Sequence, residues 1–224
     1  MLSHPADLRR PEPRWPAIVA AFSAVALHFA LPEALRVGPS WLLAIMVAAL
    51  VVAAHVFRRL DMHRENSVMG YAILLLLAAG LLYGVAMLML SLVRHTAAAI
   101  SVLQSAAVLW TTNIIVFAAW YWRLDAGGPN ERERRDAHTR GAFLFPQMTM
   151  TTESAEACGS TLAEQTNWRP SFVDYLFLAF NTSTAFSPTD VPVLSGWAKM
   201  TMMLQASISL MTIVLLAGRA VNIL

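Results

Sequence analysis

Charged residues are scarce in this chain. They make up 13% of its 224 residues, whereas 57% are hydrophobic and the mean hydropathy is +0.55. A soluble domain carries about 25% charged residues, and one small core cannot bury such an excess of apolar side chains. Much of the chain is therefore expected to lie in membrane lipid.

Cysteine and lysine are almost absent, with a single residue of each, Cys158 and Lys199. One cysteine cannot form a disulfide within the chain, and no Cys/His spacing of a metal site occurs. The arginines cluster between apolar runs, as the flanks of membrane helices do. We therefore expect no metal, no cofactor and no nucleic-acid partner. The excess of arginine over lysine, with abundant Ala and Leu, suggests a bacterial chain.

Motifs for catalysis are missing as well. No nucleophile elbow, phosphate-binding loop or convergent nucleophile and base occurs, so we predict that the chain is not an enzyme. The first residues, up to Trp15, lack the small-residue cleavage site that follows the apolar core of a signal peptide. The first apolar run is therefore interpreted as a retained span.

Long apolar runs are what the sequence does contain. At 1.5 Å per residue, runs of roughly 17 to 28 residues suit a hydrocarbon core about 30 Å thick. The first run is the shortest, and it carries His28. The five runs cover residues 15–31, 41–57, 68–93, 97–122 and 197–224. They predict an all-α membrane protein with five transmembrane helices, a multi-pass protein of the bacterial inner (plasma) membrane.

Two features inside the spans suggest close helix contacts. Gly80 and Gly84 have the small-xxx-small spacing that lets helix backbones approach each other, and packing is its ordinary explanation. Asn113, flanked by two threonines, is expected to form a hydrogen bond between helices, with a role in a functional site as the alternative.

A short apolar stretch, residues 172–180, follows a polar linker. It is too short to cross a bilayer as a helix and fits a buried or re-entrant helix. Ser171 is expected to cap its N-terminus, and Asp174 lies where a carboxylate is favourable. Periodicity alone leaves an ordinary extramembrane helix equally open.

The residues after this stretch read Asn181-Thr-Ser-Thr-Ala-Phe-Ser-Pro-Thr-Asp190-Val-Pro192. A short aromatic-rich helix, a Thr-rich loop, Asp, Pro and a last span, in this order, resemble the pore module of the potassium-channel superfamily. Pores of that family read approximately T-x-T-T-V-G-Y-G-D-x-x-P, and Thr182, Thr184, Asp190 and Pro192 match its Thr, Asp and Pro positions. The whole chain also resembles a group of uncharacterised bacterial five-span membrane proteins.

The resemblance implies a homotetrameric pore-loop cation channel, because one such loop cannot enclose an axis. It implies a re-entrant pore helix and loop between the fourth and fifth spans. Residues 1–122 would then form a four-span region, 123–170 an extramembrane linker or cap, and 171–224 the pore helix, filter-like loop and lining helix. The expected ion pathway consists of Thr182, Ser183, Thr184, Ala185, Phe186, Ser187, Pro188, Thr189 and Asp190.

The loop departs from the family in lacking both filter glycines, whose places hold Phe186, Ser187 and Pro188. The family's carbonyl ladder uses backbone angles that side chains disfavour, so a potassium-selective ladder is not expected. A wider constriction lined by hydroxyls and a carboxylate would pass a monovalent or divalent cation.

The last apolar run carries a polar stripe at helical spacing: Thr201, Gln205, Ser209 and Thr212. Polar side chains in a span face the bundle interior or a wet cavity. The stripe is therefore expected either to line the pore or to hydrogen-bond between helices.

The distribution of basic residues conflicts with the resemblance on orientation. With five spans, most arginines and Lys199 lie on the side of the N-terminus and the linker, which favours that side as cytoplasmic. The channel resemblance implies the reverse, although glutamate-receptor-type pores carry a related module inverted. We favour the N-terminus inside.

Three other classes of function compete with the channel. The main alternative is a non-conducting channel-like membrane scaffold or assembly partner, whose short helix is only structural. A secondary transporter is disfavoured because no internal repeat occurs and the spans hold no carboxylates. An enzyme is disfavoured most, because no catalytic cluster is present.

Overall fold

The structure is a computed structural model that describes residues 12–94, 98–135, 138, 141–150, 168–185 and 191–221. All regular elements in these ranges are helical, apart from one isolated β-bridge between Phe143 and Val193. The α-helices are α1 (Trp15–Phe29), α2 (Ser40–Arg59), α3 (His63–Val93), α4 (Ala99–Leu124), α5 (Pro129–Glu133), α8 (Phe172–Ala185) and α9 (Gly196–Val221). Short 3₁₀ turns cover Glu33–Leu35, Asp125–Gly127 and Pro146–Met148.

Four of these helices, α2, α3, α4 and α9, are long and apolar enough to cross a membrane. They coincide with the last four apolar runs of the sequence, which confirms an all-helical chain with membrane-spanning potential. The first run forms α1, which has only 15 residues and falls short of that length. The count of five spans therefore stays a prediction.

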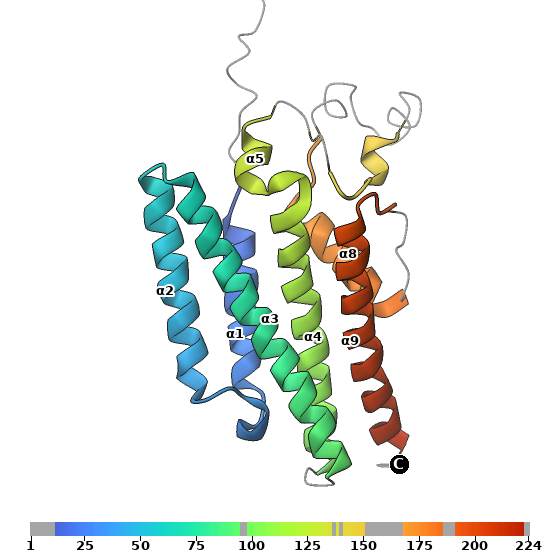
Figure 1. The fold of residues 1–224 in the computed structure, drawn as a ribbon. Coiled ribbons are helices and arrows are strands. Elements are labelled where there is room, and N and C mark those ends of the chain that lie inside the picture. Colours follow the sequence, from blue (N-terminus) through green and yellow to red (C-terminus); the bar gives the residue numbers. More distant parts are fainter. Residues whose placement is uncertain are drawn as a thin grey trace, which may run out of the picture.

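Proline and polar residues end the helices where the sequence changes character. Pro32 and Pro39 lie near the two ends of the connection between α1 and α2. A proline inside a helix removes a backbone hydrogen bond and clashes with the preceding turn, so it is found at helix boundaries. The tight turn from α2 to α3 places Asp61 at φ 55°, a left-handed angle that Asp tolerates better than most residues. Consecutive helices from α1 to α4 run antiparallel to each other (Figure 1).

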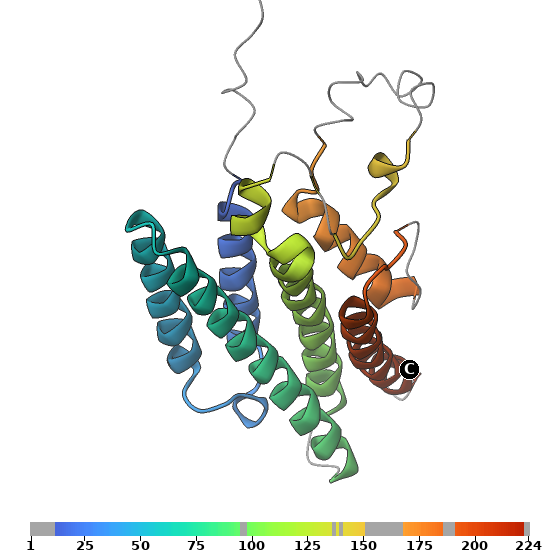
Figure 2. The ribbon, with the colours of Figure 1, turned by 45° about the horizontal axis from the view of Figure 1, so that its top comes forward.

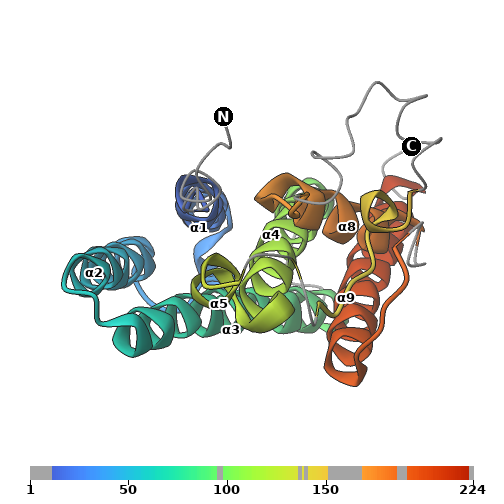
Figure 3. The ribbon, with the colours of Figure 1, turned by 90° about the horizontal axis from the view of Figure 1, so that it is seen from above.

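The fourth helix is the centre of the molecule. It packs against α1 and α3 on one side and against α8 and α9 on the other. Viewed from above, α4 lies between the group α1, α2 and α3 and the pair α8 and α9 (Figure 3). In side view α8 lies beside the upper part of α9 (Figures 1 and 2).

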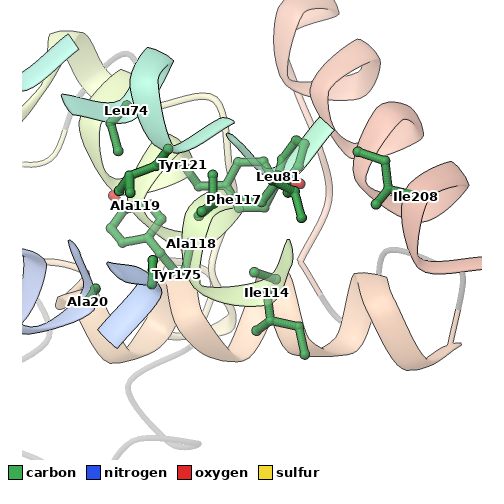
Figure 4. Packing of buried hydrophobic residues seen from close by; sticks show 14 of the residues in the cluster. Ala20, Leu74, Leu81, Ile114, Phe117, Ala118, Ala119, Tyr121, Tyr175 and Ile208 are labelled. Carbon is green, nitrogen blue, oxygen red and sulfur yellow. The ribbon is translucent and has the colours of Figure 1, made fainter. Parts of the chain in front are cut away.

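The apolar core follows this arrangement. Phe117 and Ala118 of α4 lie between side chains of α1, α3, α8 and α9, as Figure 4 shows for Ala20, Leu81 and Tyr175. Ala118 has no exposed surface. Small side chains on α4 let its neighbours approach closely, so one helix can contact four others.

Part of the linker also belongs to the core. Phe143 and Phe145 are almost fully buried, and Phe143 stacks edge-on against Tyr121, Tyr175 and Trp197. Backbone hydrogen bonds join Leu144 to Pro192 and Leu194 to Ala142. Residues 142–145 of the linker are thus bound to the residues that precede α9. The linker is polar around them in the sequence, so this burial was not expected.

The two glycines of α3 have different surroundings. A Cβ atom on Gly84 would lie 2.8 Å from Leu109 Cδ2 of α4, whereas one on Gly80 would meet nothing within 4 Å. Only Gly84 therefore serves the close contact between α3 and α4 that the spacing predicts.

We predict that Gly84→Leu lowers the stability of the folded protein by about 1–3 kcal/mol, because it overpacks the contact with α4. Gly80→Leu is the matched control and is expected to stay within about 1 kcal/mol of the parent, since leucine favours a helix. Thermal unfolding in detergent measures both. Equal effects of the two changes would show that α3 and α4 do not meet at Gly84.

Candidate functional site

A buried polar cluster joins α4 and α8 to the middle of α9. We call it the mid-helix cluster; it consists of Trp110, Asn113, Tyr121, Ser183, Gln205 and Ser209. The side chains of Asn113, Ser183, Gln205 and Ser209 have no exposed surface. Buried polar groups are costly unless they are hydrogen-bonded, so the pairing within this cluster decides how the helices fit together.

Gln205 is the centre of the mid-helix cluster. Its Nε2 donates to Ala179 O at 2.7 Å and to Ser183 Oγ at 2.8 Å, both on α8. Its Oε1 accepts from the Tyr121 hydroxyl of α4. One amide side chain therefore binds two helices at once, and its donors and acceptor are each used.

Ser209, one turn further along α9, continues the pairing. Its hydroxyl donates to Ser183 O at 2.7 Å, and Trp110 Nε1 donates to the Ser209 oxygen at 2.8 Å. Asn113 Nδ2 donates to the backbone O of Gln205 at 3.2 Å, which confirms the predicted hydrogen bond between helices. The backbone carbonyl of Ser183, near the C-terminal end of α8, thus accepts a hydrogen bond from a side chain of α9.

The structure places the predicted pathway residues of α8 on different sides. Thr182 and Ser183 are buried, and Thr182 Oγ1 donates back to Leu178 O at 2.8 Å. Thr184 and Ala185 are exposed at the last turn of the helix. The other predicted pathway residues, Phe186, Ser187, Pro188, Thr189 and Asp190, lie outside the described residues.

The polar stripe of α9 faces inward over most of its length. Gln205, Ser209 and Thr212 have no exposed surface, and Thr212 Oγ1 donates to Ile208 O and Ser209 O of its own helix. Thr201 bonds back to Trp197 O. Gln205 and Ser209 therefore form the interhelical bonds of the second alternative, whereas Thr201 and Thr212 bond within α9, and the pore-lining role stays a prediction.

Both ends of the segment that contains α8 meet one end of α4. Phe172 packs edge-on against Trp122, and Val193 pairs with Phe143, which contacts Tyr121. In the first turn of α8, Asp174 Oδ2 accepts hydrogen bonds from Ser171 N at 2.7 Å and from Ser171 Oγ at 2.8 Å. The predicted cap is thus made from Asp174 back to Ser171, the reverse of the expected direction.

The outward faces of α8 and α9 are apolar. On α8, Val173, Phe177 and Phe180 are exposed at helical spacing, and Thr184 continues their row. On α9, Met200, Met203 and Val214 are each more than half exposed. Lipid or another protein subunit must cover these faces in a membrane.

A second buried cluster, rich in charge, lies where α4 ends. We call it the end cluster; it consists of Glu12, Asp125, Arg132, His138 and Tyr175. Asp125 Oδ2 accepts from the Tyr175 hydroxyl at 2.7 Å and lies 3.0 Å from His138 Nε2, and Asp125 Oδ1 accepts from Ala142 N. The carboxylate of Asp125 thus ties α4 to α8 and to the linker.

Arg132 links the end cluster to the start of the chain. Its Nε and Nη2 bind Glu12 at 3.0 and 2.8 Å, and its Nη1 donates to the carbonyl oxygens of Trp122 and Asp125. Burial by itself lowers the pKa of the Arg132 guanidinium, but the hydrogen-bonded Glu12 carboxylate, Tyr175 and Asp125 together offset this and raise the pKa above its ordinary value. Arg132 therefore stays charged and holds four backbone segments together.

Sequence reasoning missed the end cluster. The basic residues around Arg132 alternate with acidic ones, which is typical of a solvated loop, and His138 stands alone in the sequence. The signal that was present is a pair of opposite charges, Asp125 and Arg132, in the first residues beyond an apolar run. Their partners Glu12 and Tyr175 are far away in sequence, so only folding brings them together.

We predict that Gln205→Leu lowers the free energy of unfolding by about 1–3 kcal/mol, because it leaves Tyr121 and Ser183 without their partner. Ser207→Ala is the matched control on α9, since Ser207 is exposed and bonds only to its own helix. In a double-mutant cycle, Gln205→Leu and Ser183→Ala should couple by about 1 kcal/mol. Additive effects would contradict the pairing.

Tyr175→Phe removes one hydroxyl from the end cluster and should cost about 1–2 kcal/mol, because Asp125 then loses a donor in a buried site. Tyr83→Phe changes a partly exposed tyrosine of α3 and serves as control. Chemical unfolding in detergent compares the two. No difference between the variants would show that the Tyr175 hydroxyl does not stabilise the fold.

The residues that the structure describes contain no group of three or more His, Cys, Asp or Glu side chains that could hold a metal ion. The mid-helix cluster and the end cluster instead hold the short helix α8 against α4 and α9. No protein-family model, no curated protein and no solved structure matches the chain.

Proposed function

We propose that the chain is a subunit of a homotetrameric pore-loop cation channel with a filter that lacks glycine. The observation that carries this proposal is the anchoring of the short helix α8 to the middle of a long apolar helix. The proposal rests on the depth of that anchor, on the apolar outer faces and on the sequence of the loop after α8.

The depth follows from helix geometry. At about 1.5 Å per residue, Gln205 and Ser209 lie roughly 14 and 20 Å along α9 from Gly196. A hydrocarbon core is about 30 Å thick, so these residues correspond to its middle third. The C-terminal turn of α8 is bonded to both of them, while its first turn lies at the end of α4. This supports a helix that enters half of the membrane and returns.

Such a position suits a cation at the end of α8. The C-terminal carbonyl groups of a helix carry a partial negative charge, which favours a positive ion. Thr184 is exposed at this end, and Asp190 follows in the loop before α9. We assign residues 184–190 to the constriction and assign Gln205, Ser209 and Ser183 to holding the pore helix in place.

Four copies supply what one subunit lacks. A single α8 and loop cannot surround an axis, and closed rotational symmetry is the usual solution in membrane pores. The exposed row Val173, Phe177, Phe180 of α8 offers an apolar face for a neighbouring subunit. Tight packing there would place four copies of Thr184 around one axis.

One observation favours a second candidate function, a non-conducting scaffold. The predicted lining residues Gln205, Ser209 and Thr212 have no exposed surface, and the first two bond to α8 instead of facing an open space. In this alternative the mid-helix cluster only fixes the fold, and the tetramer, if formed, is closed to ions.

The test combines the mass of the complex in mild detergent with cation flux into liposomes. We expect a tetramer and a flux that Asp190→Asn reduces about tenfold, because it removes one carboxylate from each subunit. Asp61→Asn is the matched control, since Asp61 is exposed in the turn after α2 and its left-handed backbone accepts asparagine.

A tetramer without flux would support the scaffold. A monomer or dimer without flux would overturn the channel, because the constriction needs fourfold closure. Equal flux through the Asp190→Asn and Asp61→Asn proteins would remove Asp190 from the ion pathway.

A further inference from the structure

A cavity of about 140 Å³ lies among α1, α2, α3 and α4, away from the proposed pore. For scale, an engineered apolar cavity of about 150 Å³ holds a benzene molecule. Seen from above, these four helices stand around a common centre on the side of α4 opposite to α9 (Figure 3). Ile18 and Arg58, both in its wall, are more than a third exposed, so the cavity opens to the surface.

The wall of this cavity has two chemically different parts. Most of it is hydrocarbon, from residues such as Ala21, Ile73, Leu77 and Val116. The remainder includes three arginines, Arg14, Arg58 and Arg123. All three lie where α1 and α3 begin and where α2 and α4 end, which is one end of the helix group.

Arg123 is the least compensated of the three arginines. Its side chain is buried, and Nη2 donates to the carbonyl oxygens of Asn66 and Ser67 at 3.0 and 2.9 Å. The Tyr71 ring lies 5.3 Å below its guanidinium carbon. Within the described part of the chain, no carboxylate forms an ion pair with it. Carbonyls and a ring orient a buried cation but do not neutralise it.

The other two arginines share one carboxylate. Glu133 lies 3.0 Å from Arg14 and 3.8 Å from Arg58, and Arg14 Nε is buried without a hydrogen-bond partner among the described residues. Glu12, the next acidic group, is bound by Arg132. Three guanidinium groups therefore face one available carboxylate, and the polar end of the cavity has a net positive charge.

A glycine on α3 makes room for this arrangement. A Cβ atom on Gly70 would clash with the guanidinium group of Arg123, so any other residue there would displace it. The sequence thus combines a buried arginine with the one residue type that lets it lie flat against a neighbouring helix.

We propose that this cavity binds an anionic amphiphile, with its phosphate or carboxylate head against Arg14, Arg58 and Arg123. The cavity holds only the first few carbons of the hydrocarbon chain against its apolar wall, and the rest of the chain leaves through the opening along the helices. A head group at the end of the helices and a chain running along them match the way in which lipid lies beside a spanning helix. Basic pockets between spanning helices bind anionic head groups in this manner. The proposal does not depend on the channel.

The experiment uses the full chain in a neutral detergent and counts bound molecules by native mass spectrometry. The probes are phosphatidylglycerol, phosphatidylcholine with the same acyl chains, a 16-carbon fatty acid and inorganic phosphate. We expect phosphatidylglycerol, the fatty acid or both to bind and to raise the unfolding temperature. Binding of only one identifies the source of the anion, a membrane phospholipid or a free fatty acid.

Neighbouring arginines on α2 provide matched variants. Arg58→Gln should weaken binding on the order of tenfold, the loss expected for one charge-assisted hydrogen bond. Arg59→Gln removes the same charge one residue later, where the side chain is outside the cavity wall and contacts it only through His55, and should weaken binding clearly less. Arg58 is 38% exposed, so the fold should tolerate its replacement.

A second pair tests the apolar wall. Ala21→Leu fills the cavity and should reduce binding of the amphiphile, whereas Ala79→Leu adds the same volume on the exposed face of α3 and should not. Thermal unfolding without probe shows that each variant is folded. Equal binding of phosphatidylcholine, equal stabilisation by inorganic phosphate, or equal binding by the Arg58→Gln and Arg59→Gln proteins would overturn the proposal.

Discussion

The amide of Gln205 is the interaction on which the arrangement of the last three helices depends. In a hydrocarbon environment an unpaired amide is costly, so Gln205 can lie in the middle of α9 only where other polar groups meet it. The Tyr121 hydroxyl of α4 and the end of α8 provide them. The position of α8 along α9 is thereby fixed to within one helical turn.

At the end of α4, buried charged groups likewise depend on partners from other parts of the chain. Arg132 and Asp125 are buried side by side, and each is satisfied by partners from other segments. The mid-helix cluster and the end cluster therefore hold α8 at two points. These directional hydrogen bonds add to the apolar packing of α8, which by itself resists sliding or rotation against α4 less strictly.

Helix α4 packs against both halves of the molecule, the group α1 to α3 and the pair α8 and α9. Trp122 lines the cavity among α1 to α4, packs against Phe172 of α8 and donates to Glu12 of the end cluster. Arg123 next to it turns toward α3. Both side chains line the cavity, but they point in different directions, because successive side chains of a helix are about 100° apart. The cavity and the short helix are separate sites on a shared support.

The amino-acid sequence by itself determined the helical class and four of the long helices, because apolar runs bounded by Arg and Pro leave the backbone no other way to satisfy its hydrogen bonds in lipid. It also indicated the short helix and the polar stripe of α9. Only the tertiary structure decided that Gln205 and Ser209 bind α8 and α4, since the partner of a polar side chain in a helix depends on which helix lies beside it. The same holds for Arg123 and for the end cluster, where residues more than a hundred positions apart, Glu12 and Arg132, form one ion pair.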